Sequence, residues 1–102
     1  MPYTPHRWLI VRVNVADPFY KVLGVWYGGY LHGDSWRMNS GIERVVEEEK
    51  GYELHGSSGS VYLCGKENYG TSAYGASILE GYKDLVTPLS EVDAIKILEG
   101  LK

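Results

Sequence analysis

The chain has 102 residues, of which 44% are hydrophobic and 23% charged, and its formal net charge is −3. This composition excludes intrinsic disorder, and the length predicts one domain over residues 1–102. The acidic balance disfavours nucleic-acid binding, which needs a basic face that neutralises phosphates. The thirteen glycines, nine tyrosines and three tryptophans favour strands and turns.

A single cysteine, Cys64, excludes an internal disulfide, whereas small secreted domains usually contain several. The first residues are not followed by the apolar run of a signal peptide. No stretch approaches the roughly 18 apolar residues of a membrane-spanning helix. We therefore predict a cytoplasmic protein that makes no membrane contact.

The N-terminal third predicts a hairpin with a wide loop. Residues 7–15 alternate with the two-residue period of a strand that has one fully buried face, and a proline then ends it. Residues 20–27 have partly helical spacing, but a central glycine and the β-branched and aromatic residues around it favour a second strand. Residues 28–35 tolerate positive φ and predict a wide loop that returns through residues 36–38.

Two further hairpins are predicted after this loop. A strand over residues 42–47 leads into a three-residue turn with Gly51 in the left-handed region, and a two-residue turn follows at Ser58-Gly59. These turns predict the cross-strand pairs Val46 with Leu54, Glu47 with Glu53, Leu54 with Leu63, His55 with Tyr62, and Glu53 with Cys64. The shared buried face would consist of Val46, Leu54, Val61 and Leu63.

Two helices are predicted in the C-terminal third. Thr71 or Ser72 can cap the first helix. Its apolar stripe consists of Tyr74, Ile78, Leu79, Tyr82 and Leu85. A proline then breaks the chain, and Ser90 with Asp93 resembles a capping box that opens the last helix. This helix would continue through Val92, Ile95, Ile97 and Leu98.

This order of elements predicts an α+β fold. Because the strands come first and the helices last, we expect an antiparallel sheet, or a small curled barrel, of about five strands. The two C-terminal helices would pack on this sheet. A parallel βαβ architecture is not expected.

The motifs that could carry chemistry are incomplete. Residues 65–72 lie between a strand and a helix, as a phosphate loop does, but a threonine stands where that loop needs lysine. His32 and Asp34 could form a metal site or an acid–base pair with another histidine or the cysteine, but metal sites need three or four ligands. The predicted register places His55 on the face of Cys64, yet no third triad member is present. We predict no metal, no cofactor, no catalytic residue and an inert thiol.

The strongest candidate site is a run of aromatic and glycine residues. Large rigid rings beside flexible backbone suit stacking and protein contacts, although some of these rings must fill the core. The predicted binding residues are Trp26, Tyr27, Tyr30, His32 and Trp36.

An acidic strip follows this run in the sequence. It consists of Glu47, Glu48, Glu49 and Glu53 around one hairpin. Such a strip is typical of a solvated turn. The alternatives are a surface for a basic partner and a mimic of nucleic-acid charge.

Three sequence segments lie between Lys21 and Tyr69: residues 26–30 (WYGGY), 34–42 (DSWRMNSGI) and 58–62 (SGSVY). Together they resemble a pattern in small uncharacterised proteins of phages and bacterial mobile elements. No activity and no catalytic residue accompany this pattern. The resemblance therefore implies only a source among mobile genes.

The function predicted from these features is a small binding or protein-interaction module that uses the aromatic and glycine-rich surface. The partner would be a protein, either a second copy in a homodimer or another chain, with Tyr27 or Tyr30 near the centre of contact. A small-molecule partner is also compatible. Two alternatives are a barrel that holds a small molecule and a small hydrolase or transferase. The enzyme would use His32, Asp34, His55 or Cys64.

Overall fold

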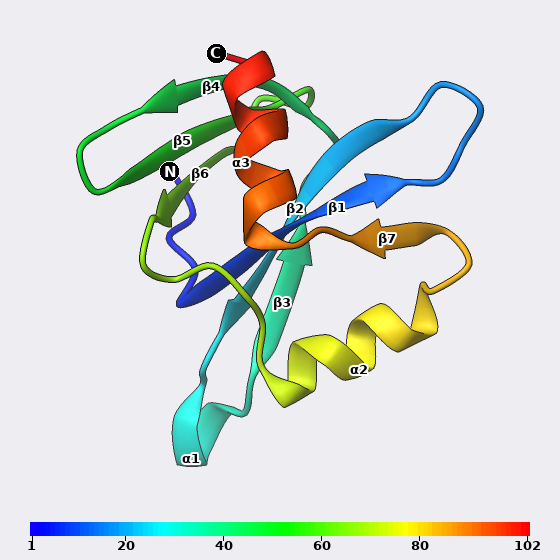
Figure 1. Ribbon diagram of the computed structural model, residues 1–102. Helices are drawn as coiled ribbons and strands as arrows, with labels where there is room; N and C mark the ends of the chain where they lie inside the picture. The colour runs from blue at the N-terminus through cyan, green and yellow to red at the C-terminus, as the bar shows by residue number, and fades with distance from the viewer.

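A computed structural model describes the backbone of all 102 residues and every side chain except that of Tyr30. The elements, in chain order, are β1 (Arg7–Val13), β2 (Phe19–Trp26), α1 (Gly29–His32), β3 (Ser35–Met38), β4 (Ile42–Glu47), β5 (Gly51–Gly56), β6 (Val61–Gly65), α2 (Ala73–Gly81), β7 (Val86–Pro88) and α3 (Glu91–Gly100) (Figure 1). The α+β prediction is confirmed. The strands form two open antiparallel sheets instead of one sheet or a barrel of about five strands.

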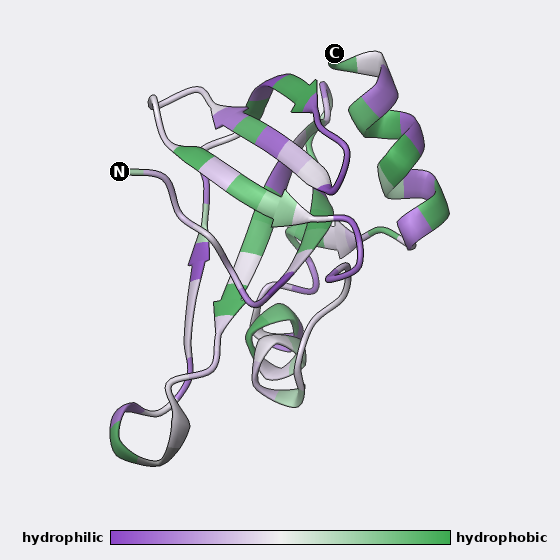
Figure 2. Cartoon of the chain, turned by 90° about the vertical axis from the view of Figure 1, so that its left-hand side faces the viewer, coloured by the Kyte–Doolittle hydropathy of each residue, from purple (hydrophilic) through white to green (hydrophobic). Residues whose placement is uncertain are grey.

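The two sheets and the helices form layers. The larger sheet has the strand order β3-β2-β1-β7, and the smaller has the order β4-β5-β6. One core lies between the two sheets and includes side chains of α3, and a second core lies between the larger sheet and α2. Figures 1 and 2 show the larger sheet in the middle, with α2 on one side and the smaller sheet and α3 on the other.

Strand β1 supplies side chains to both cores. Trp8 and Ile10 point into the core between the sheets, while Leu9 and Val11 point into the core beneath α2. The prediction of one buried face is therefore wrong, because the central position of β1 covers both of its faces. The apolar alternation runs past the end of the strand, where Val15 is 51% exposed.

The strand predicted over residues 20–27 is confirmed as β2, which begins and ends one residue earlier, and the wide loop after it is an arm that projects from the body (Figure 1). The arm contains α1, a single helical turn. Gly29, its first residue, and Gly33, the residue after it, have φ values of 68° and 66°. These left-handed conformations favour glycine, and they allow the chain to reverse within a few residues.

The β4–β5 register differs by one residue from the prediction. Val45, not Val46, lies opposite Leu54, because the turn between the strands has two residues instead of three. The N–H of Glu48 donates to the carbonyl of Gly51 at 2.8 Å and closes this shorter turn. Gly51 belongs to β5 and does not have the predicted left-handed conformation.

The β5–β6 register also differs by one residue. The N–H of Gly56 donates to the carbonyl of Ser60 at 2.8 Å, which leaves a three-residue loop with Gly59 at a φ of 93°. The observed pairs are Tyr52 with Cys64, Glu53 with Leu63, Leu54 with Tyr62, and His55 with Val61. Tyr62 and Cys64 therefore enter the core, and Leu63 is exposed. The predicted buried face is wrong, because a one-residue shift exchanges the two faces of a strand.

Both predicted helix caps are confirmed. Ser72 accepts a hydrogen bond from the N–H of Gly75 at 3.1 Å, and Ser90 accepts one from the N–H of Asp93 at 3.2 Å. The predicted break before α3 instead holds the short edge strand β7, which pairs with β1 and ends at Pro88. None of the helices in the described part of the chain is long and apolar enough to cross a membrane.

Candidate functional site

The two tryptophans of the predicted aromatic surface support the larger sheet from opposite faces. Trp26 packs against the core between the sheets, and its indole N–H donates to the carbonyl of Thr4 at 3.1 Å. Trp36 packs against the core beneath α2, where its ring meets that of Tyr82 edge-on with centroids 6.0 Å apart. Because they lie on opposite faces and are half-buried, the two rings do not form one surface.

The other predicted binding residues lie in or beside the arm. Tyr27 is 48% exposed and stacks on His6, with ring centroids 5.4 Å apart and planes inclined by 8°. His32 is exposed in α1, and the side chain of Tyr30 lies outside the described residues. Asp34 accepts a hydrogen bond from a backbone N–H of the arm at 3.4 Å. Of the predicted tyrosine and tryptophan rings, the only described one exposed here is that of Tyr27, which is already stacked on a histidine.

The residues considered for metal or acid–base chemistry do not come together. Within the described residues, no three His, Cys, Asp or Glu side chains are placed to hold a metal ion. Cys64 is buried, and this burial raises the pKa of its thiol, which disfavours the reactive thiolate. His55 lies on the other face of the same sheet, so the predicted shared face is wrong. Its Nε2 lies 2.9 Å from Oε1 of Glu53.

Lysines partly neutralise the acidic strip. Glu47 accepts hydrogen bonds from Lys102 and Lys66, and these bonds lower the pKa of its carboxyl to about 2. The Glu53 carboxyl raises the pKa of the neighbouring Glu48 carboxyl. Glu47 therefore links β4 to the C-terminal end of the chain, and the strip is not a uniformly free acidic surface.

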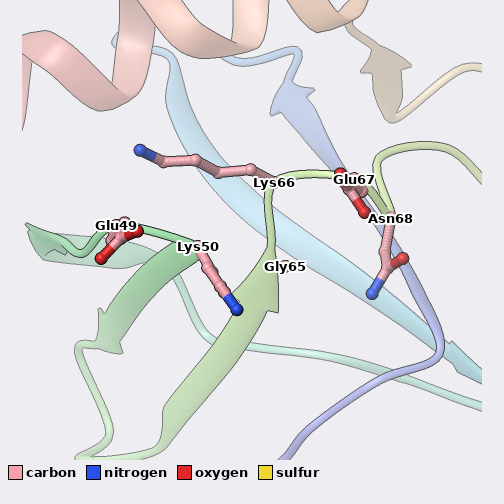
Figure 3. A pocket seen from close by; sticks show the side chains of 6 residues that line it. All are labelled: Glu49, Lys50, Gly65, Lys66, Glu67 and Asn68. Atoms are coloured by element: carbon pink, nitrogen blue, oxygen red, sulfur yellow. The ribbon is translucent and has the colours of Figure 1, made fainter.

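A polar hollow of about 460 Å³ lies between the β4–β5 turn and the loop that follows β6 (Figure 3). Its lining residues are Glu49, Lys50, Gly65, Lys66, Glu67 and Asn68. In Figure 3 the charged side chains point in different directions, and Lys66 already binds Glu47 at 2.6 Å. Since charges of both signs are present and do not converge, this hollow offers no fixed donor set for a ligand.

An apolar groove at the edge of the core beneath α2 is the strongest candidate site. It has a volume of about 240 Å³, and four β-strands, the β1–β2 loop and the segment after α2 contribute to it. The groove is lined by Val13, Asn14, Val15, Phe19, Lys21, Met38, Tyr82, Leu85 and Val86. Four of the nine exposed large hydrophobic side chains among the described residues gather here: Val15, Phe19, Tyr82 and Leu85, between 38% and 60% exposed.

The groove exists because α2 covers only part of the sheet. Near its start, Gly75 brings the helix against Val25, to which a Cβ at Gly75 would approach within 2.9 Å. The helix ends at Gly81, and the chain then turns toward β7 through hydrogen bonds from Leu85 and Val86 to the carbonyl of Tyr82. The sheet surface beside the β1–β2 loop therefore stays uncovered.

The groove residues were missed because sequence reasoning placed them in the core. Val15 continued the strand alternation, and Tyr82 and Leu85 continued the helical stripe. In the structure β1 ends at Val13 and α2 ends at Gly81, so these side chains extend beyond the elements that would bury them. The sequence signal for the groove is an apolar periodicity that continues beyond the last residue of the strand or helix.

Lys21 is the only charged side chain that lines the groove. Its Nζ lies 6.0 Å from the centroid of the Phe19 ring, a separation at which a weak cation–π attraction begins. The groove therefore combines an apolar floor with one cation at its rim. Comparison of the chain with family models, curated proteins and solved structures finds no match.

Proposed function

We propose that this chain is a protein-binding module whose apolar groove receives an apolar side chain of the partner. The observation that carries this proposal is the gathering of Val15, Phe19, Tyr82 and Leu85 around one concave surface. Single exposed apolar residues are normal on proteins, but contiguous ones mark interaction sites. An anchor side chain buried in such a pocket supplies much of the binding energy at protein interfaces.

The size of the groove favours a side chain over a whole small molecule. Pockets for drug-sized ligands usually measure about 300–1,000 Å³ and enclose most of the ligand. The groove holds about 240 Å³, which suits one large apolar side chain. Its titratable lining side chains, Lys21 and Tyr82, do not form a nucleophile–base pair of the kind that a hydrolase needs.

A selection from a library of random twelve-residue peptides displayed on a surface tests this function. We expect selected peptides to contain an apolar anchor and to bind Leu85→Asp at least about tenfold more weakly, because hot-spot contacts are worth more than 1 kcal/mol. Leu85 is 60% exposed, so its replacement should leave the fold intact.

Two exposed apolar residues outside the groove provide matched controls. Val92→Asp on α3 should leave peptide binding unchanged. Leu31→Asp should also leave it unchanged; Leu31 is 83% exposed in the arm. Peptides that bind Leu85→Asp as tightly as the parent would overturn the groove as the site. Sensitivity to Leu31→Asp alone would move the site to the arm, where the sequence analysis placed it.

We further propose that the chain forms a homodimer, lies in the cytoplasm and comes from a phage or mobile-element gene. The homodimer can be tested by light scattering over a concentration series. A dimer that Leu85→Asp dissociates would identify the partner in the groove as a second copy.

A further inference from the structure

We propose that the partner binds as an extended strand along the free edge of β3, with an apolar side chain in the groove and an acidic side chain beside Arg37. This inference rests on the proposed function and names the chemistry of its partner. In strand addition, main-chain hydrogen bonds supply affinity and pockets for alternate side chains supply specificity. The structure places an edge and a pocket of this kind next to each other.

The edge of β3 is free to pair with another strand, whereas the other three sheet edges are covered or too short. The edge of β6 is covered by the N-terminal segment, where Tyr3 exchanges backbone hydrogen bonds with Val61 and Leu63 at 2.9 and 2.8 Å. On β4, the N–H of Val45 donates to the carbonyl of Leu101 at 3.2 Å. The edge strand β7 has three residues and ends in proline, which cannot donate.

The outer backbone groups of β3 have no such cover. Among the described residues, β3 makes backbone hydrogen bonds only with β2. The N–H of Asn39 donates to Val22, so alternation along the ladder turns the N–H and C=O groups of Trp36 and Met38 away from β2. In the strand order β3-β2-β1-β7, β3 is an edge strand, and it leads upward from the arm (Figure 1).

The groove begins at the end of this same edge. Met38 is the last residue of β3 and lines the groove, and the Trp36 ring contacts Tyr82 of the groove wall. A strand added to β3 would direct every second side chain to the face that bears α2. An apolar side chain of that strand near Met38 would therefore enter the groove.

The charges at this edge favour an acidic partner. Arg37 projects from the opposite face of β3, where its guanidinium lies 4.6 Å from the centroid of the Tyr3 ring. Neither Arg37 nor the groove residue Lys21 takes part in an ion pair with a described side chain. Both are cations on a chain whose net charge is −3. In an extended segment that alternates apolar and acidic residues, the apolar side chains would lie on the groove face and the acidic side chains would lie on the face of Arg37.

A second copy of this chain fits the edge less well. Two β3 strands that pair through Trp36 and Met38 in one antiparallel register would place Arg37 directly opposite its own copy. Like charges directly opposite each other destabilise a strand pair. We therefore identify the occupant as an acidic, apolar segment of a different protein.

The test uses a nine-residue peptide of alternating glutamate and leucine with blocked ends, added to the full chain labelled with ¹⁵N. We expect amide shifts at Trp36 and Met38, and binding about tenfold weaker to Arg37→Glu. Two altered peptides keep the protein unchanged: one is N-methylated at alternate residues, which removes strand hydrogen bonds, and one carries lysine in place of glutamate. Both should bind at least about tenfold more weakly.

The outcomes separate the two proposals. If the N-methylated peptide binds as well as its parent, and Leu85→Asp still weakens both, strand addition is overturned and the groove function remains. If Leu85→Asp has no effect on peptide binding, the groove function fails as well. If the lysine peptide binds as tightly as the glutamate peptide, the proposed preference for an acidic partner is wrong. No shift at any β3 amide at about 1 mM peptide overturns the strand proposal outright.

Discussion

The two faces of β1 contribute side chains to two cores, one of which is fully covered and the other only partly covered. Trp8 and Ile10 enter the core between the sheets, where the largest side chains are shielded from solvent. Leu9 and Val11 enter the core beneath α2, whose apolar surface continues outward to the exposed Val15. One core is closed by a second sheet and a helix, and the other ends where α2 ends. The uncovered part of the second core is the groove.

This difference separates residues that stabilise the fold from residues available for contact. Full burial of an apolar side chain contributes about 1.5–3 kcal/mol relative to its exposed state. The exposed groove residues Phe19 and Leu85 provide only part of this, so a partner that covers them would recover the remainder. The closed core between the sheets therefore stabilises the fold, whereas the exposed groove at the edge of the second core is available for binding.

The largest expected effect comes from truncating a closed-core residue and a groove residue in parallel. Leu54 is fully buried between the sheets, and Leu54→Ala should cost about 2–5 kcal/mol of unfolding free energy. Leu85 is 60% exposed, and Leu85→Ala should change it by no more than about 0.5 kcal/mol. Urea unfolding followed by tryptophan fluorescence measures both. Similar losses would show that the groove is a structural core.

The next effect distinguishes the two ends of α2. A Cβ at Gly75 would lie 2.9 Å from Val25 Cγ2 and closer still to Thr71 Oγ1, so Gly75→Ala should cost about 1–3 kcal/mol. A Cβ at Gly81 would meet nothing within 4 Å, and Gly81→Ala should stabilise by about 0.4–1 kcal/mol. Thermal unfolding provides both values. Equal effects would contradict the close approach of α2 near Gly75.

A smaller effect tests the registers of the second sheet. Leu63 is exposed on the outer face, and Leu63→Ala should cost less than about 1 kcal/mol. Tyr62 is 1% exposed, and its replacement by alanine should cost several times more. If chemical denaturation gave the reverse order, the strand would have to be shifted by one residue, which is the register predicted from sequence.

Elements specified by local signals could be predicted from the sequence. The two helix caps, at Ser72 and Ser90, depend on a side chain three residues from its donor. The strand β4 matches the predicted range of residues 42–47. The antiparallel α+β class followed from the order of the elements.

Features that depend on the exact length of a turn, or on the exact end of a strand or helix, could not be predicted. The two turns of the smaller sheet differ by one residue from the expectation, and the change in the β5–β6 turn reverses which of Tyr62 and Leu63 is buried. The groove depends on where β1 and α2 end relative to each other in space, and no local pattern encodes that relation. The aromatic run was found, but its tryptophans support the sheet, which only the packing of both faces reveals.

The smallest expected effect concerns the ion pairs that close the structure at β4. Lys102 and Lys66 lower the pKa of the Glu47 carboxyl from 4.5 to about 2. A carboxyl whose pKa is lower in the folded state adds stability above its unfolded pKa and loses it as the pH falls through its folded pKa. The contribution of Glu47 should therefore be complete above about pH 4.5 and disappear toward pH 2.

Glu47→Gln tests this contribution by thermal unfolding at several pH values. We expect a lower melting temperature than the parent at pH 7, and a difference that shrinks as the pH falls from 4.5 to 2, because the parent carboxyl then becomes neutral too. The effect should be small and should decrease with salt, since these side chains are exposed to solvent. Glu49→Gln is the matched control, because Glu49 belongs to the same strip and forms no ion pair with a described side chain. If the two variants follow the same pH profile, the link between β4 and the C-terminal end of the chain contributes no stability.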